Sequence, residues 1–194
     1  FRTGAGPALS HTGDIGGAGA LGKTGDGALV LFGNNTYTGV TTVEAGTLKI
    51  AGGATTGSAG ANIAATLTTA GGRMTVSGDT ALLGGTLNAT MLGIGSGTGD
   101  FQTQTLSGDG VVNATVLNQG SVNAGAAGIT FTGDVSGAGS FLGTNTFTGT
   151  FRPGNSPAQV EFENMVLNGT LEIELGGLIA GAEYDQLIGA AGMV

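Results

Sequence analysis

Four glutamates in the last third of the sequence have the residue type and spacing for acid/base chemistry. Glu161 and Glu163 are two positions apart, and so are Glu172 and Glu174. Side chains at i and i+2 of a β-strand point to the same face, so each pair presents two carboxylates together. Carboxylates flanking a glycosidic bond are the acid and base of glycoside hydrolysis. A carbohydrate-active enzyme is therefore one alternative. The other interpretation is that outward glutamates keep a sheet soluble and block sideways aggregation.

The chain has few residues that could serve as a nucleophile or a thiolate ligand. His11 is the only histidine, and Cys is absent. A Cys/His nucleophile or a His/Cys zinc site therefore cannot be assembled, and no Gly-x-Ser-x-Gly turn is present. We interpret His11 as a solvated residue near the N-terminus. The sequence predicts no enzyme and assigns no catalytic, cofactor-binding or metal-ligating residue.

Repeated acidic triplets suggest turns, with calcium binding as the alternative. Ser/Thr-Gly-Asp occurs six times, beginning at Thr12, Thr24, Ser77, Thr98, Ser107 and Thr132. Gly and Asp adopt the backbone conformations that tight corners require. Solenoids that bind Ca²⁺ at such corners carry tandem Gly-Gly-x-Gly-x-Asp nonapeptides, and the spacings here are irregular. We therefore predict strand corners and no cofactor, with Ca²⁺ as the open alternative.

Several asparagines also invite a specific role. Asn35 and Asn145 each stand just before a Thr-aromatic pair, where their amides could stack into an internal ladder. Asn-x-Thr triplets match glycosylation acceptors and arise here by composition in a Thr-rich chain. They begin at Asn34, Asn88, Asn113 and Asn168.

Composition predicts that short β-strands position these residues. Gly occupies 42 of 194 positions, Pro only 3, and charged residues make up 9% against 40% hydrophobic. So much Gly disfavours helices, and we expect almost none. Short alternating stretches predict strands with one face inward. They are Ala28–Phe32, Thr47–Ile50, Arg73–Val76, Val111–Ala114 and Thr170–Leu175.

Internal repeats favour a solenoid over a sandwich or a barrel. Gly13–Ala20 aligns with Gly133–Ser140, and each leads into a Gly-x-Asn-Thr-aromatic-Thr-Gly segment. A Gly-Thr-Leu step recurs at Gly46, Gly85 and Gly169, where we expect strands to start. Coils of about 20 residues give roughly nine short coils, stacked over about 45 Å. We predict an all-β, parallel β-helix (β-solenoid) forming a single domain, residues 1–194, with a possible variant coil or cap at 151–194.

At these residues the chain resembles the autotransporter-associated β-strand repeat. The resemblance is carried by Gly25–Ile50, which runs from Leu-Val-Leu-Phe-Gly-Asn-Asn-Thr-Tyr-Thr-Gly into Ala-Gly-Thr-Leu. Pro153–Pro157, Leu171–Leu175 and Tyr184–Leu187 are similar to the terminal coils of such proteins. The resemblance implies a right-handed parallel β-helix, export from a Gram-negative bacterium, and a role as a spacer, an adhesin stalk or a matrix component.

The net charge and the exposed strand edges indicate which classes of binding partner the chain can have. A net charge of −8 argues against nucleic acid and anionic membrane surfaces, and no apolar run is long enough to insert in a membrane. The ends of a β-helix expose unpaired strand edges, and Ile188–Val194 is apolar. We therefore expect a secreted, non-enzymatic structural protein of the bacterial surface or matrix. Its partners are other copies, joined head to tail in filaments, or cell-surface components.

Two further alternatives stay open from the sequence. The chain could be an adhesin stalk or passenger fragment, or a carbohydrate-active β-helix that uses the glutamates named above. The first residue is Phe1 rather than Met, and the run Tyr184–Val194 stops where similar proteins continue into another strand. We interpret the chain as either a processed subunit or a piece of a longer protein.

Overall fold

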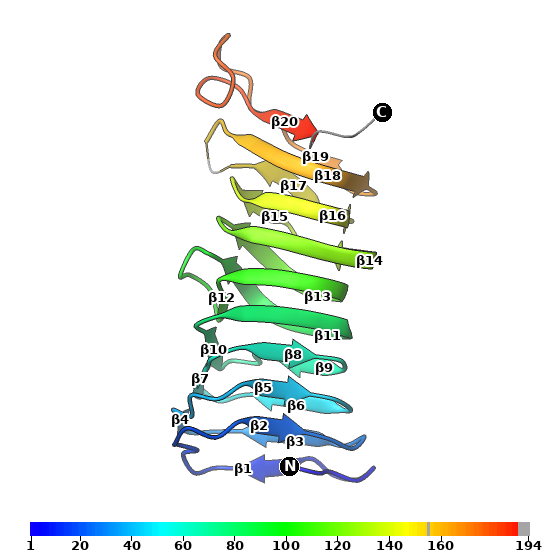
Figure 1. Cartoon of the computed structure of the whole chain (residues 1–194). Helices are drawn as coiled ribbons and strands as arrows, with labels where there is room; N and C mark the ends of the chain where they lie inside the picture. The colour runs from blue at the N-terminus through cyan, green and yellow to red at the C-terminus, as the bar shows by residue number, and fades with distance from the viewer. Residues whose placement is uncertain (155, 190–194) are drawn as a thin grey trace.

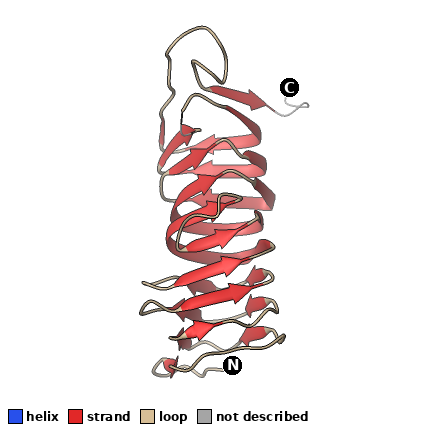
Figure 2. Ribbon diagram, turned by 90° about the vertical axis from the view of Figure 1, so that its left-hand side faces the viewer, coloured by secondary structure: helices blue, strands red, loops and turns tan. Residues whose placement is uncertain are grey.

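The computed structural model describes residues 1–154 and 156–189, and over this range it is a parallel β-helix (Figures 1 and 2). The described residues contain strands and turns but no helix. Accordingly, this part of the chain offers no helix of the length and hydrophobicity that a bilayer crossing needs. The all-β solenoid predicted from the repeats is confirmed.

The first coils show the plan of the stack, which has three walls. Wall 1 begins with β1 (Leu9–His11), β3 (Ala28–Leu31), β6 (Thr47–Ile50) and β9 (Thr66–Thr68). Wall 2 begins with β2 (Leu21–Lys23), β5 (Thr41–Val43) and β8 (Ala61–Ile63). Wall 3 begins with β4 (Asn34–Asn35), β7 (Thr55–Ser58) and β10 (Arg73–Val76). Each of these strands pairs in parallel with the next strand above it in its wall.

Higher in the stack, long strands bend around the corners and contribute to more than one wall. They are β11 (Asp79–Ile94), β13 (Thr105–Asn118), β14 (Ser121–Phe131), β16 (Ser140–Phe147) and β18 (Gln159–Leu167). Shorter strands complete walls 2 and 3, namely β12 (Phe101–Thr103), β15 (Val135–Gly137), β17 (Thr150–Pro153), β19 (Thr170–Leu171) and β20 (Gln186–Gly189). In the described chain wall 1 holds nine strands, from β1 to β18, and so about eight turns.

Alternating side chains fill the interior in continuous rows. In wall 1, Leu29, Leu48, Leu67 and Leu87 lie one above another, each with no exposed surface. Val112, Phe131 and Phe147 continue the same row. Because each coil repeats the inward position of the coil below, a short alternating pattern is enough to build a core along the whole stack.

Phenylalanines replace the aliphatic side chains in the upper half of the core. Phe131 and Phe147 stack with ring centroids 5.4 Å apart and planes 11° apart. Phe141 and Phe162 stack in wall 2 at 4.9 Å and 4°. Both pairs are register neighbours in adjacent coils, so the strand spacing itself sets the ring separation.

One strand stands out of sequence order. β12 pairs with β10 below it and with the Leu92–Ile94 segment of β11 above it. The chain therefore lays down Leu92–Ile94 in wall 3, turns back through the loop 95–100, and inserts Phe101–Thr103 underneath. Walls 1 and 2 have no matching extra strand, so wall 3 is one strand taller at this level.

The predicted strands are largely confirmed, with two corrections. Ala28–Leu31, Thr47–Ile50 and Arg73–Val76 form strands, and Val111–Ala114 lies inside β13. The prediction for Thr170–Leu175 was wrong beyond Leu171, because the chain leaves the wall there for a loop that joins β19 to β20. The Gly85 step does not start a strand either, since it lies within β11 at a register shift.

Candidate functional site

Five of the six Ser/Thr-Gly-Asp triplets lie where the chain passes between walls, as predicted, whereas Thr98–Asp100 lies in the loop that joins two strands of wall 3. In three of the five, the carboxylate accepts a backbone N–H of the coil above. Asp14 Oδ1 accepts the Asn34 N–H at 2.7 Å. Asp109 Oδ1 accepts the Gly128 N–H at 2.7 Å, and Asp134 Oδ1 accepts the Thr150 N–H at 2.9 Å. Each carboxylate reaches one coil up and pairs a backbone donor that the turn leaves free. The arrangement supports the turn interpretation of these triplets.

Asp100 has the largest number of such bonds. Its carboxylate accepts the backbone N–H of Thr90 and Met91 and the hydroxyl of Thr69, at 3.1, 2.7 and 2.6 Å. Burial raises the pKa of Asp100, but the hydrogen bonds from Thr69, Met91 and Thr90 outweigh burial and lower the pKa below the ordinary 3.8. Asp100 thus holds the loop 95–100 against β9 and β11. Within the described residues no three His, Cys, Asp or Glu side chains gather as a metal would require.

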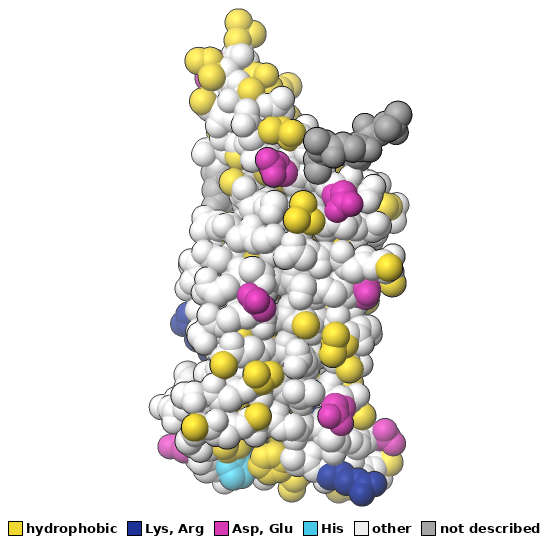
Figure 3. Space-filling model, viewed as in Figure 1, with side chains coloured by type: hydrophobic (Ala, Val, Ile, Leu, Met, Phe, Trp, Pro, Cys, Tyr) yellow, Lys and Arg dark blue, Asp and Glu magenta, His cyan; other side chains and the backbone are white. Residues whose placement is uncertain are grey.

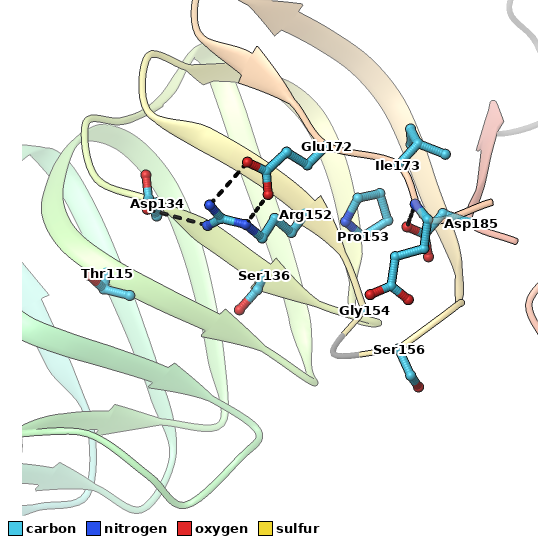
Figure 4. Close-up of a pocket in the computed structure, with 11 residues that line it drawn as sticks. Thr115, Asp134, Ser136, Arg152, Pro153, Gly154, Ser156, Glu172, Ile173 and Asp185 are labelled. Atoms are coloured by element: carbon cyan, nitrogen blue, oxygen red, sulfur yellow. Dashed lines mark hydrogen bonds and ion pairs between the residues drawn. The ribbon is translucent and has the colours of Figure 1, made fainter. Parts of the chain in front are cut away.

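The glutamate pairs lie in different surroundings. Glu172 and Glu174 line a cleft of about 560 Å³ along wall 3, together with Asp134, Arg152 and Asp185 (Figure 4). Glu161 and Glu163 do not line it, since they lie on β18 in wall 2. Glu163 Oε2 accepts the Gly143 N–H at 2.8 Å. The two pairs therefore do not face one substrate position.

Arg152 neutralises much of the cleft. Its guanidinium pairs with Glu172 on one side and with Asp134 Oδ2, 3.3 Å away, on the other. Hydrogen bonds from the Thr150 N–H and from Arg152 lower the pKa of Asp134, and Glu172 and Asp134 raise the pKa of Arg152. A general acid at neutral pH needs the opposite shift, a raised carboxyl pKa.

Asp185 is also occupied by backbone donors. Its two oxygens accept the N–H groups of Ala158 and Glu174, at 2.9 and 2.8 Å, and the residue is buried. Asp185 therefore joins the Glu174 end of the loop after β19 to the segment that precedes β18. The cleft is a structural junction of coils rather than a pair of free catalytic carboxylates.

His11 lies at the base of the stack rather than in open solvent. Its ring centroid is 5.9 Å from that of Phe1, and its Nε2 atom is buried without a hydrogen-bond partner. The side chain is half-buried on β1. The expectation of a solvated residue therefore holds only in part, because the ring is half-buried beside Phe1.

A buried lysine was missed by sequence reasoning. Lys23 has no exposed surface, and its Nζ donates to the carbonyl oxygens of Thr24, Gly25 and Ala45 at 3.1, 2.7 and 2.9 Å. Burial lowers the pKa of Lys23, and the negative charge of Asp26 offsets part of that shift. The ammonium satisfies three carbonyls at the corner between walls 2 and 1, in two successive coils.

Polar side chains also fill part of the lower core. The Tyr37 hydroxyl and Thr41 Oγ1 are 2.6 Å apart, and Thr41 Oγ1 donates to Ser58 Oγ at 3.0 Å. Asn35 Oδ1 accepts the Ile15 N–H at 3.1 Å, and Asn35 Nδ2 donates to Thr56 Oγ1 at 3.3 Å. Burial raises the pKa of Tyr37. Together these bonds tie the three lowest coils of wall 3 to one another.

The internal amide ladder expected for Asn35 and Asn145 was wrong. Asn35 lies in wall 3 beside Thr56, whereas Asn145 lies in wall 1 between Ile129 and Met165. The segment that contains Asn35 begins 20 residues, about one coil, after Gly13, whereas the segment that contains Asn145 begins only 10 residues after Gly133. The two similar segments therefore lie on different walls. Asn145 Nδ2 instead donates to Leu142 O and Gly143 O in its own coil, at 2.9 and 3.3 Å.

Fold and site together define a parallel β-helix whose polar side chains secure one coil to the next. Comparison with known proteins agrees with that class. Residues 21–50 match the family model of the passenger-associated-transport-repeat. The match contains Lys23, Asn35, Tyr37 and Thr41, which are among the buried polar residues of the lower coils. The resemblance noted from the sequence is confirmed.

A curated relative points the same way. The adhesin BmaC autotransporter of Brucella suis biovar 1 (strain 1330) is 43% identical over 86 residues. The alignment covers 43% of this chain and 2% of that adhesin. The chain thus spans a very small share of the length of the curated relative it matches. No solved structure matches the chain.

Proposed function

We propose that this chain is a non-enzymatic rod of a bacterial surface protein, a solenoid segment of an autotransporter passenger exported by a Gram-negative cell. The coil-to-coil bonding of its polar side chains is the observation that carries the proposal. Asp14, Asp100, Asp109, Asp134 and Lys23 all bond to neighbouring backbone or side-chain groups. Such bonds stiffen a stack and leave few groups free for chemistry.

The rod forms a single solenoid domain in this proposal, with residues 151–194 as its variant end. Its length suits a spacer that holds other parts of a surface protein away from the cell. Its partners are cell-surface or matrix components and further copies of the same chain. The part of the C-terminal run that comprises Ala190–Val194 lies outside the described residues.

Surface labelling tests the location. Antibodies raised against the purified chain are expected to label intact cells of the bacterium that encodes it, without permeabilisation. Protease added to intact cells should remove the label. Label seen only after permeabilisation would contradict the proposal.

A polysaccharide panel tests the absence of catalysis. We expect no release of reducing sugar or unsaturated product from any substrate. Release that is lost in Glu172→Gln or Glu161→Gln would contradict the proposal and restore the carbohydrate-active alternative. Glu44→Gln, an exposed carboxylate elsewhere on the stack, is the matched control.

An adhesive role is the second candidate, favoured by the identity to an adhesin. In that role the monomeric rod itself holds a host glycan or cell surface. Beads coated with the chain would bind host cells more than beads coated with an unrelated solenoid. Equal binding by the two kinds of bead would reject adhesion by this segment.

A further inference from the structure

A groove on wall 3 crosses three adjacent coils, at the level of β4, β7 and β10. It has a volume of about 470 Å³ and is lined mainly by side chains that carry hydroxyl or amide groups. The three strands lie along the left edge of the stack in Figure 1. Wall 3 continues below them at Ile15 and above them at β12. The groove is therefore part of the side of the rod and is built without either of its ends.

A glycine at an outward position of β7 creates the groove. Gly57 pairs with Thr75 of β10 in the coil above, and Thr36 lies beside it in the coil below. A Cβ on Gly57 would meet no atom within 4 Å. The hollow thus spans two strand spacings, about 10 Å, which is wide enough for a sugar ring. Threonine hydroxyl and methyl groups form its rim.

Hydrogen bonds between buried side chains hold the floor of the groove in place. Asn35 Nδ2 donates to Thr56 Oγ1 at 3.3 Å, and Thr41 Oγ1 donates to Ser58 Oγ at 3.0 Å. Asn35, Thr56 and Ser58 all line the groove and are buried. Since these bonds join one coil to the next, the groove keeps its shape without a ligand, which lowers the entropy cost of binding.

Arg73 adds one positive charge to a lining that is otherwise uncharged. Among the described residues that line the groove there is no carboxylate. The ion pairs of the described chain involve Arg152 instead. Asp100 lies one strand above Arg73, but its two oxygens accept hydrogen bonds from Thr69, Thr90 and Met91. The guanidinium of Arg73 is therefore available to a carboxylate of a ligand.

The charge of the whole chain limits how much negative charge a ligand can carry. The net charge is −8, and Figure 3 shows acidic side chains at several levels of one face, with Lys and Arg only near the base and at one edge. A polyanion such as a sulfated polysaccharide would therefore be repelled beyond the groove. A ligand with a single carboxylate meets Arg73 without that cost.

We propose that the groove binds an acidic sugar, meaning a sugar ring that carries one carboxylate. Arg73 pairs with the carboxylate, and the Thr75 hydroxyl exchanges a hydrogen bond with a ring hydroxyl. Asn34 Oδ1 accepts the Thr55 hydroxyl, which leaves the Asn34 Nδ2 group to donate to the sugar. The inference goes beyond the surface rod proposed above, and it gives the adhesive candidate a class of ligand.

Titration of the isotopically labelled, full-length chain with methyl glucuronide, followed by nuclear magnetic resonance, tests the site. The backbone amide signals of Gly57 and Thr75 should shift and reach saturation. Methyl glucoside has a hydroxymethyl group in place of the carboxylate and should bind about tenfold to a hundredfold more weakly, the factor for losing a charge-assisted hydrogen bond. Absence of saturable shifts, or shifts confined to other walls, would overturn the proposal.

A pair of charge variants tests the role of Arg73. Arg73→Gln should remove the preference for the acidic sugar, so that methyl glucuronide and methyl glucoside bind equally. Lys49→Gln is the control, because it removes the same charge from a half-exposed position of β6 on wall 1, and it should keep the preference. A preference that both variants lose equally would reflect the net charge alone and would overturn the assignment of Arg73.

A second pair of variants fills a hollow without disturbing the fold. Gly57→Thr places a side chain in the groove and should abolish binding of both sugars. Gly22→Thr is its control on wall 2, because a Cβ there also meets no atom within 4 Å. A circular dichroism spectrum like that of the unaltered chain shows that each variant folds. Unchanged binding by a folded Gly57→Thr chain would place the sugar elsewhere and overturn the site.

A carboxylate without a sugar ring separates the two classes of acidic ligand. N-acetylaspartate should bind more weakly than methyl glucuronide, because it lacks the ring hydroxyls that the groove pairs with. Equal or tighter binding of N-acetylaspartate would indicate an acidic peptide and overturn the acidic sugar. Surface labelling of cells depends on none of these ligands, so failure of sugar binding is distinct from failure of the surface rod.

Discussion

Lys23 pairs with Val43 in the register of β2 and β5, so a lysine occupies the inward position that valine takes one coil above. Ile63 follows in the same row. The fold accepts a charged group there because the corner supplies three carbonyl oxygens. The inward row of wall 2 therefore begins, at β2, with an ammonium group bound to backbone carbonyls rather than with an apolar side chain.

Replacing this lysine should destabilise the chain. Lys23→Met leaves three partly buried carbonyls without their donor, which costs about 2–4 kcal/mol of unfolding free energy. Urea denaturation measures the loss. Lys49→Met is the control, because Lys49 is a half-exposed lysine of β6, and it should stay within about 0.5 kcal/mol. Equal effects of the two changes would contradict a role for the buried ammonium.

The Asp100 carboxylate should make the stability of the fold depend on pH in the acid range. Its hydrogen bonds hold the folded-state pKa below the ordinary 3.8, so the carboxylate stabilises the fold above about pH 4. That contribution is lost as pH falls through the lowered pKa, because protonation removes an acceptor of the Thr90 and Met91 amides. Asp100→Asn should lose about 1–2 kcal/mol at pH 7 and have a flatter urea midpoint below about pH 4. Identical pH profiles of the two proteins would refute this account.

The phenylalanine stack predicts a graded series. Phe141→Ala removes a ring stacked on Phe162 and should cost about 3–5 kcal/mol, whereas Phe141→Leu fills most of the space and should cost less. Leu142→Ala, at an exposed position beside it, should have little effect. Thermal unfolding orders the three variants. An alanine variant as stable as the leucine variant would show that the stack contributes little.

Close approach of two coils makes one glycine indispensable. Gly108 has φ +92°, and a Cβ there would lie 2.0 Å from the Leu82 carbonyl oxygen of the coil below. Gly108→Ala should therefore cost about 2 kcal/mol or more, from the left-handed backbone and the clash together. Gly22→Ala has open space and should be close to neutral. The test is the urea midpoint of each variant, and equal midpoints would contradict the packing argument.

Sequence patterns predicted the parts of the fold that repeat. The alternation in Ala28–Leu31 and Thr47–Ile50 identified strands and their inward faces, and the Ser/Thr-Gly-Asp triplets marked corners. Lys23 could also have been found. Leu21-Gly22-Lys23 stands 20 residues before Thr41-Thr42-Val43 and 40 before Ala61-Asn62-Ile63, which places Lys23 at an inward position.

Other features of the fold and the site could not be predicted, because they depend on contacts between coils that the sequence pattern does not show. The Asn35 and Asn145 segments are nearly identical in sequence, yet coil length places them on different walls. The triplet Thr98–Asp100 was predicted to be a turn, but the sequence did not show with which strand the next segment would pair. The pairing of Arg152 with Asp134 and Glu172 joins three successive coils, and only the register of the coils brings them together.

The insertion of β12 between β10 and the Leu92–Ile94 segment has a consequence for folding. A chain that winds coil upon coil reaches Leu92 before Phe101, when the position beneath Leu92–Ile94 is still empty. That segment must either wait unpaired or first pair with β10 and then be displaced. We therefore place the slow step of winding at residues 91–103, and the coils below them can form independently of those above.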